Sequence, residues 1–287
     1  MNRLNPAKRA LVLHCLLEGG GIRSTARIAK VSRTTVQRLL KLAGEATRAY
    51  QERALRMLYC PIIEMDECWS FIHTKSFRKH ENSAPDHGDC WVWCAVDRRS
   101  RLVISAMAQG RGLACARWFV QDVRDRVIGS PLICTDGAKN YQEAIKIHFD
   151  GEFGCRFGQI IKPRWKELEK LKGLDDPNGW MPSQVIGKPD RLHIHGSIRP
   201  EEIQTTRVER MYLHLRTRCR RFTRRTNGVS KTLEYHKQAL SLWQFDQNFM
   251  RRIPATKRTP AQVVGLADRV WGMDELLCLV DEWEHRN

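Results

Sequence analysis

The chain has 287 residues, 42% of them apolar, which is enough for one catalytic domain with its own hydrophobic core and a small additional module. Its formal net charge is +17. Lys and Arg side chains in such excess repel one another unless phosphate groups neutralise them, so we expect nucleic acid as the partner. Because no run of about 18 apolar residues occurs and no signal-peptide core follows the first charges, we expect no membrane span and a cytoplasmic location.

Residues 1–58 predict an all-α module of the helix-turn-helix type. A short amphipathic helix follows Pro6 and stops at the glycines 19–21. Two further helices then flank a tight turn at Val31 and Ser32, and the apolar residues recur at spacings that face a shared core. A generic helical hairpin, without a DNA-binding role, is the alternative interpretation.

The second of these two helices is the predicted DNA-reading element. Ser32 can cap it, because a Ser hydroxyl accepts a hydrogen bond from the exposed amides of the first turn. Its first turns then expose side chains suited to phosphates and to base edges in a major groove. These side chains are Arg33, Thr34, Thr35, Gln37 and Arg38.

Residues 59–287 predict an α/β domain of the RNase H-like class, with a mixed sheet and helices. Three strand candidates that form an antiparallel meander are followed by a helix, a short apolar strand and a second helix. This is the element order of the RNase H-like fold, in which the first strand and the end of the fourth strand each carry an acid. We therefore expect Asp66 and Asp136 to lie side by side. The six segments are 62–72, 89–99, 101–110, 114–128, 131–137 and 138–149.

The segment from about 151 to 202 has a weaker pattern, rich in Pro, Gly and charge, with a helix candidate at 164–173. We interpret it as an insertion between the second acid and a final catalytic helix, and we expect a helical tail at the C-terminus.

Glu209 begins that final helix, at the boundary between its apolar stripe and solvent, from which it can lean toward the two aspartates. We expect the same helix to continue to Arg225 and to present arginines as a phosphate track. The track includes Arg216, Arg220 and Arg224.

Three carboxylates on rigid elements suit hard divalent cations, so we expect Asp66, Asp136 and Glu209 to bind Mg²⁺, with Mn²⁺ as a substitute, for phosphoryl transfer on DNA. Each acid alone could be an ordinary strand-end or ion-pairing group. Glu67 competes with Asp66 for the site, but strand alternation places Glu67 on the apolar side, which favours Asp66.

Four blocks of the sequence also resemble the transposases of the bacterial and archaeal insertion-sequence-one (IS-one) family. The blocks are MDECW, TDGAKNY, VERMYLHLR and TPAQVVGLADRVWGMDELL, and the resemblance covers roughly Ile62 to Leu277. The resemblance implies an Asp-Asp-Glu (DDE) transposase with an RNase H-like fold, and it assigns the triad to Asp66, Asp136 and Glu209. Many members carry Asn three residues after the catalytic Glu, where this chain has Tyr212.

The predicted function is thus that of an insertion-sequence transposase, which cleaves and joins double-stranded DNA at transposon ends and at a target. Two DNA ends imply a homodimer or a higher homo-oligomer. An RNase H-like nuclease that does not transpose is the first alternative. A DNA-binding regulator derived from a transposase is the second, although the presence of all three acids argues against loss of catalysis.

Overall fold

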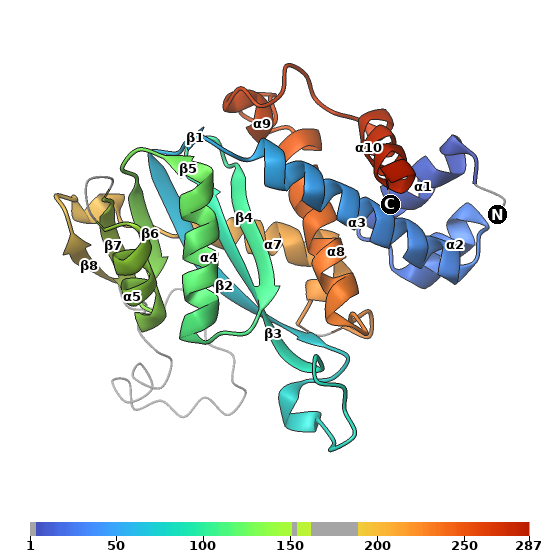
Figure 1. Cartoon of the computed structure of the whole chain (residues 1–287), viewed down its shortest axis with the longest axis horizontal. Coiled ribbons are helices and arrows are strands. Elements are labelled where there is room, and N and C mark those ends of the chain that lie inside the picture. The colour runs from blue at the N-terminus through green and yellow to red at the C-terminus, as the bar shows by residue number, and fades with distance from the viewer. Residues whose placement is uncertain (1–3, 151–153, 162–188, 225, 287) are drawn as a thin grey trace, which may run out of the picture.

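The computed structural model describes residues 4–150, 154–161, 189–224 and 226–286 (Figure 1). An N-terminal group of helices packs beside a mixed sheet that has helices on both faces. Among the described residues, no helix has the length and apolar character needed to cross a membrane. The helix candidate at 164–173 lies outside the described residues.

Within the described residues, six strands form one mixed sheet in the order β4-β3-β2-β6-β7-β8. Strands β2, β3 and β4 pair antiparallel, β6 and β7 run parallel to β2, and β8 returns antiparallel at the edge. An antiparallel meander whose first strand pairs in parallel with β6, which in turn pairs in parallel with β7, is the RNase H-like arrangement, so the predicted fold class is confirmed. The strands are β2 (Ile62–Ile72), β3 (Gly88–Asp97), β4 (Val103–Gln109), β6 (Leu132–Asp136), β7 (Arg156–Ile161) and β8 (Asp190–His195), and β1 (Leu58–Tyr59) pairs separately with β5 (Val127–Ile128).

Helices cover both faces of this sheet. Helices α4 and α5 lie on one face and α7 lies on the other, while α8 packs against the edge strand β4 (Figure 1). Shorter elements and a C-terminal helix complete this part. The bounds are α4 (Leu113–Arg126), α5 (Lys139–His148), α7 (Thr206–Arg218), α8 (Leu233–Phe245), α9 (Pro260–Val263), α10 (Met273–Arg286), the 3₁₀ turns η1 (Ser76–Arg78), η3 (Pro200–Glu202) and η4 (Arg220–Phe222), and the π-helical segment η5 (Asp246–Met250).

Strands β7 and β8 both lie in the segment interpreted as an insertion, where only the alternation of residues 191–195 indicated a strand. Strand β7 is buried along most of its length and so lacks the alternation that marks a half-exposed strand. Its Gly158 packs so closely on Ile203 that an added Cβ would lie 2.7 Å from that side chain. Strand β8 is exposed at every residue, as an edge strand can be. The described ends of this segment therefore belong to the sheet.

The N-terminal part contains the three predicted helices, α1 (Pro6–Leu17), α2 (Ile22–Ala29) and α3 (Arg33–Ala54). Lys30 adopts a left-handed conformation with φ 53° and turns the chain between α2 and α3. The Ser32 hydroxyl accepts a hydrogen bond from the Thr35 amide at 3.0 Å, so the predicted cap is confirmed. Val12, Ala26 and Val36 belong to a small core that joins the three helices.

Helix α3 is long enough to leave this module and pack along α8. Gly44 allows the close approach, because an added Cβ would lie 2.4 Å from the Cβ of Gln238. Further along α3, the Gln51 amide donates to the Ser241 carbonyl at 3.2 Å. Since Leu40 and Ala43 of α3 also belong to the main hydrophobic core, the N-terminal helices and the sheet are joined by buried contacts. A domain boundary at residue 58 stays a prediction.

The arginine-rich segment after Glu209 is not one continuous helix, so that prediction is wrong. Helix α7 ends at Arg218, Cys219 is extended with φ −135° and ψ 99°, and the 3₁₀ turn η4 follows. Phe222 in this turn is buried against His236 of α8, with 4.2 Å between ring centroids. Packing against α8 therefore outweighs the helical pattern of the sequence. Arg225 lies outside the described residues.

The packing at Gly44 leads to a prediction. Ala favours a helix over Gly by about 1 kcal/mol, but overpacking a buried contact costs about 1–3 kcal/mol, so Gly44→Ala should lower the free energy of unfolding. Gly112→Ala is the control, because no atom lies within 4 Å of the added Cβ. Urea denaturation measures both. Greater stability of Gly44→Ala than of the wild type would contradict the close α3–α8 contact.

Candidate active site

The two predicted aspartates lie at adjacent positions in the sheet. Strands β2 and β6 pair in parallel up to Met65 and Thr135, so Asp66 and Asp136 are the next residue on each strand. Both are half-buried. An Asp66 oxygen accepts from the Glu67 amide at 2.8 Å, and an Asp136 oxygen accepts from the Ala138 amide at 3.1 Å. The expected adjacency of Asp66 and Asp136 is confirmed.

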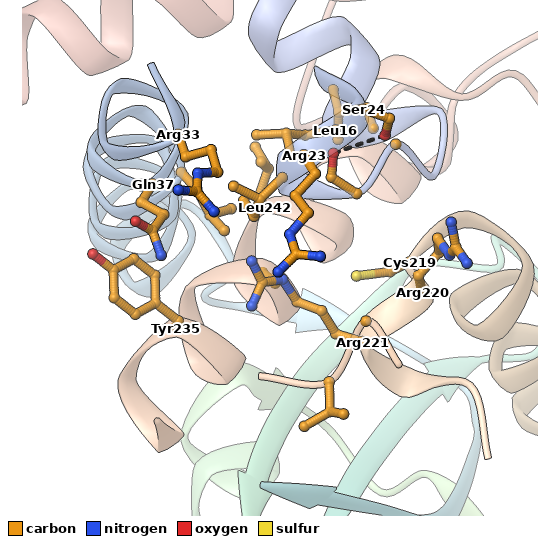
Figure 2. A pocket seen from close by; sticks show the side chains of 18 of the residues that line it. Leu16, Arg23, Ser24, Arg33, Gln37, Cys219, Arg220, Arg221, Tyr235 and Leu242 are labelled. Atoms are coloured by element: carbon orange, nitrogen blue, oxygen red, sulfur yellow. Dashed lines mark hydrogen bonds between the residues drawn. The ribbon is translucent and has the colours of Figure 1, made fainter. Parts of the chain in front are cut away.

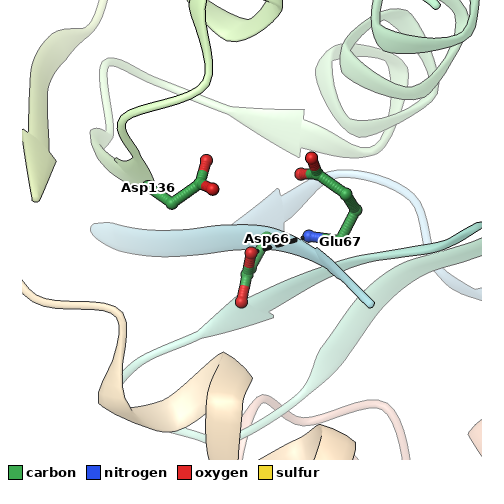
Figure 3. A group of neighbouring side chains, drawn as sticks. All are labelled: Asp66, Glu67 and Asp136. Carbon is green, nitrogen blue, oxygen red and sulfur yellow. Dashed lines mark hydrogen bonds between the residues drawn. The ribbon is translucent and has the colours of Figure 1, made fainter. Parts of the chain in front are cut away.

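Glu67 joins the two aspartates in one acidic cluster (Figure 3). One carboxylate oxygen from each of Asp66, Glu67 and Asp136 can be chosen so that all lie within 4.8 Å of one another. The Glu67 side chain is 2% exposed and pairs through Oε1 with Nε of Arg111 at 3.0 Å. Among the described residues, its other oxygen, Oε2, is buried without a hydrogen-bond partner in normal geometry, although the buried Tyr141 hydroxyl interacts with this carboxylate. Strand alternation does put Glu67 on the other side from Asp66, but both side chains can reach Asp136 at the end of β6.

The pKa values of Asp66 and Glu67 are raised because these acids are buried close to other carboxylates. Burial raises the pKa of Asp66 well above its ordinary value, and the charges of Asp136, Glu67 and Glu209 raise it further. Burial and the Asp136 charge likewise raise the pKa of Glu67, although Arg111 opposes them. A buried carboxylate beside two others is a donor set that fits a hard divalent cation. The residues present therefore fit the expected metal.

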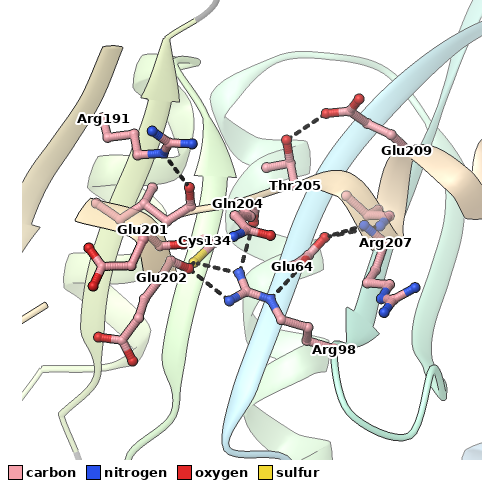
Figure 4. A network of polar contacts seen from close by, with 12 residues as sticks. Glu64, Arg98, Cys134, Arg191, Glu201, Glu202, Gln204, Thr205, Arg207 and Glu209 are labelled. Atoms are coloured by element: carbon pink, nitrogen blue, oxygen red, sulfur yellow. Dashed lines mark hydrogen bonds and ion pairs between the residues drawn. The ribbon is translucent and has the colours of Figure 1, made fainter. Parts of the chain in front are cut away.

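Glu209 lies in the first turn of α7, on the face of the sheet that Asp66 shares. Its Oε1 accepts a hydrogen bond from the Thr205 hydroxyl at 2.6 Å (Figure 4). Its charge contributes to the raised pKa of Asp66, so the two carboxylates interact. Among the described residues, the cluster within 4.8 Å includes Glu67 and not Glu209. The structure thus places Glu209 beside the aspartates with its carboxylate on Thr205.

A buried carboxylate fixes the position of Glu209 relative to Asp66. Glu64 lies two residues before Asp66 on β2, and its side chain is fully buried. Its Oε2 accepts from the amides of Arg207 and Val208, at 2.6 and 3.2 Å, and so caps the first turn of α7. The Thr205 side chain does not cap this helix. Glu64 therefore connects the strand of the first acid to the helix of the third.

Arg98 completes this network from the end of β3 (Figure 4). Its Nε donates to Glu64 Oε1 at 2.6 Å. Its two terminal nitrogens donate to the carbonyls of Glu202 and Gln204 at 2.8 and 3.1 Å. A guanidinium with its donors fixed in this way holds the segment before α7 against the sheet. No local pattern in the sequence marks Glu64 or Arg98, because 143 positions separate Glu64 from Arg207.

Tyr212 provides a second attachment of α7 to β2. Its hydroxyl lies within hydrogen-bonding reach of the Asp66 carbonyl and of the Val92 carbonyl, the latter at 3.0 Å. The ring is buried in the main core. Where many members of the resembled family carry Asn, this chain therefore uses a Tyr that contacts the main chain of Asp66 itself.

The predicted DNA-binding residues fall into three places. Arg33, Thr34 and Gln37 are exposed at the start of α3 and line a cavity that also includes Arg220 of η4. Arg38 forms an ion pair with Glu284 at 2.5 Å. This cavity is not lined by Thr35, Arg38, Arg216 or Arg224. Thr35 hydrogen-bonds to Ser32 within the cap, and the charges of Arg216 and Arg224 act on Cys68, close to Asp66 on β2.

Comparison with protein-family models and with curated proteins gives no match. Three solved structures are similar to this chain at low identity. The piggyBac transposase synaptic complex with hairpin DNA is 11% identical with a TM-score of 0.45, over 99% of this chain and 73% of that chain. The intasome of simian T-cell lymphotropic virus in complex with PP2A regulatory subunit B56 gamma is 15% identical with a TM-score of 0.35, over 93% and 75%. The Mos1 strand transfer complex is 16% identical with a TM-score of 0.21, over 51% and 57%. At these TM-scores the fold assignment rests on the strand order of this chain, and membership of the IS-one family stays a prediction.

The acidic cluster leads to a prediction about pH. Because the pKa of Asp66 is raised in the folded protein, the metal-free protein loses stability as pH rises from about 4 toward that raised value. Asp66→Asn removes this loss and can still accept the Glu67 amide. At pH 8 the metal-free variant should unfold about 2–4 °C above the wild type, with a smaller difference at pH 4.

Thermal unfolding with and without Mg²⁺ tests whether this cluster binds the ion. Mg²⁺ should raise the unfolding temperature of the wild type and leave that of Asp66→Asn nearly unchanged. A wild type that is insensitive to Mg²⁺, or a variant stabilised equally by it, would contradict the assignment of this cluster as a metal site.

The Glu64 network leads to a separate prediction. Glu64→Gln keeps the shape of the side chain but leaves the Arg98 guanidinium without its buried carboxylate, which should cost about 3 kcal/mol of unfolding free energy. Glu143→Gln is the matched control, because Glu143 pairs with Arg117 at an exposed site and should change stability by less than about 0.5 kcal/mol. Equal losses in chemical denaturation would show that Glu64 does not anchor α7.

Proposed function

We propose that this chain is a DNA transposase of the IS-one type, which cleaves and joins DNA strands with Asp66, Asp136 and Glu209. The observation that carries the proposal is the arrangement of acids on the RNase H-like sheet. Asp66 lies within β2 beside Asp136, the last residue of the adjacent parallel strand β6, and Glu64 and Tyr212 hold the helix of Glu209 against the strand of Asp66. The four sequence blocks that resemble IS-one transposases include all three acids.

The acids of this site act as oxygen donors for Mg²⁺ or Mn²⁺. Asp66, Asp136 and Glu209 would hold the ion, and Glu67, which lies in one cluster with the two aspartates, would add a buried carboxylate. When bound, such an ion activates a water or a 3′-hydroxyl and stabilises the departing oxygen during displacement at phosphorus. The chain itself supplies the fixed positions of these oxygens. The Thr205 hydroxyl donates to the Glu209 carboxylate and orients it.

Cationic side chains near the acids position the DNA. Arg216 and Arg224 lie near Cys68, on the strand that carries Asp66, so they can contact phosphates next to the reacting bond. At the start of α3, Arg33, Thr34 and Gln37 are exposed and available for contacts with transposon ends. Thr35 and Arg38 support this helix through the cap and through Glu284. Arg220 contributes from η4.

A nuclease that does not transpose would use the same acids. The exposed start of α3 favours the transposase, because non-specific cleavage does not need a helix that recognises DNA ends. The regulator hypothesis is disfavoured by an acidic cluster that retains three carboxylates. We propose further that the protein acts in the cytoplasm, and as a homodimer or higher homo-oligomer, because two transposon ends must be joined.

The test is strand joining by duplexes that carry the inverted repeats flanking the coding sequence. The wild type should join them to target DNA in the presence of Mg²⁺. Asp66→Asn, Asp136→Asn and Glu209→Gln should each reduce joining at least about a thousandfold, which equals about 4 kcal/mol of transition-state stabilisation. Binding of the duplexes should persist, since the cations that contact phosphates are unchanged.

Glu201→Gln is the control for Glu209→Gln, because Glu201 is an exposed acid that precedes α7 and pairs with Arg199. It should join DNA at the wild-type rate. Full Mg²⁺-dependent joining by any of the three acid variants would remove that residue from the site. Cleavage without joining, or the absence of flanking inverted repeats, would favour the nuclease.

A further inference from the structure

A cavity of about 700 Å³ lies between the N-terminal helices and the segment that follows the catalytic helix (Figure 2). Helices α2 and α3 form one side of it. The end of α7, turn η4, residues 227–231 and α8 form the other side. It is separate from the acidic cluster, because neither Asp66, Glu67 nor Asp136 lines it.

The cavity is strongly cationic. Seven Lys and Arg side chains line it, and no Asp or Glu is among the described residues that do so. Arg23 and Arg221 point toward one another from α2 and η4 (Figure 2). Burial lowers the pKa of Arg221, as expected for a cation without a carboxylate beside it. The seven cations are Arg23, Arg27, Arg33, Arg218, Arg220, Arg221 and Lys231.

Most of these cations lack a neutralising partner among the residues that the structure describes. Arg218 is the exception, since its guanidinium lies 2.8 Å from Glu18. Arg221 donates to the neutral hydroxyl of Ser230 at 3.2 Å. Within the described part of the chain, the other five cations form no ion pair. Like charges that face one another across a cavity repel unless an anion lies between them, so the geometry selects an anionic ligand.

The uncharged part of the lining suits a phosphate group. Gln37, Thr34 and Ser24 add polar side chains on the α2–α3 side. Trp243 lines the other side, and its buried indole N–H has no acceptor within the described residues. Arginine forks and neutral N–H and O–H donors together match the several oxygens of a phosphate better than the two of a carboxylate.

We propose that this cavity binds the phosphate backbone of a DNA strand, which it holds at once from α2–α3 and from the segment after α7. The identity of the ligand as DNA rests on the proposed function, whereas the phosphate chemistry rests on the cavity alone. Because α7 carries Glu209 and α3 carries the exposed Arg33 and Gln37, one strand held here connects end recognition to the catalytic helix.

The experiment compares two double variants of equal charge. Arg23→Gln with Arg27→Gln removes two cations of the cavity on α2, where substitution leaves the core intact. Arg48→Gln with Arg258→Gln removes two arginines outside it. Binding of a fluorescent DNA duplex is measured against salt concentration. The cavity variant should reduce the salt slope by about 0.9 for each phosphate that it no longer neutralises, and the control should not.

An unchanged slope in the cavity variant, or an equal reduction in both, would overturn the proposal. Arg221→Gln is a second cavity variant, and its slope should also fall while thermal unfolding confirms its folding. Inorganic phosphate at matched ionic strength separates the two sources of phosphate. Phosphate should stabilise the wild type more than the cavity variant. If phosphate does so but the salt slope of DNA binding is the same in the wild type and the cavity variant, the cavity binds a free anion and the DNA assignment is overturned.

The same samples distinguish failure of the proposed function from failure of this inference. Asp66→Asn should keep the wild-type salt slope, because it leaves the cavity intact. A wild type that shows the expected slopes and phosphate effect but never joins DNA would overturn the transposase and leave the cavity assignment standing.

Discussion

The fully buried carboxylate of Glu64 is the interaction on which the arrangement of the site depends. It accepts the first amides of α7 with one oxygen and the Arg98 guanidinium with the other. A buried charge of this kind is tolerated only when its partners are all in place, so β2, the end of β3 and α7 have one compatible arrangement. This arrangement sets the position of Glu209 on α7 relative to Asp66 on β2. The third acid of the proposed triad is thereby coupled to the first through the core as well as through the effect of its charge on Asp66.

Much of the sheet could be predicted from sequence, because its information is local. Strands β2, β3, β4 and β6 carry apolar patterns bounded by turns, and their order implied the adjacency of Asp66 and Asp136. Strand β7 could not be predicted, since it is buried without alternation, and the alternation of residues 191–195 did not show that β8 is the edge strand of this sheet. The helix after Glu209 was predicted too long, because the burial of Phe222 against α8 is a tertiary effect.

The adjacency of Asp66 and Asp136 could be predicted from sequence, but the residues that support them could not. Glu67 was set aside by strand parity, yet its longer side chain reaches Asp136 at the end of β6 from the opposite side of β2. Glu64 and Arg98 act across large sequence separations, which no periodicity reports. The cationic cavity likewise arises from α2, α3, η4 and α8 together, so the sequence predicted Arg33 and Arg220 as separate DNA contacts and not as parts of one site.

The central claim is that Asp66, Asp136 and Glu209 converge on one divalent cation on the RNase H-like sheet. Anomalous X-ray diffraction from crystals grown with Mn²⁺ tests it most directly, because the ion is located independently of any assay. We predict an anomalous peak bounded by the carboxylates of Asp66 and Asp136, with Glu209 moved from Thr205 toward it. A peak elsewhere, or no peak at saturating Mn²⁺ with Glu209 still on Thr205, would contradict it.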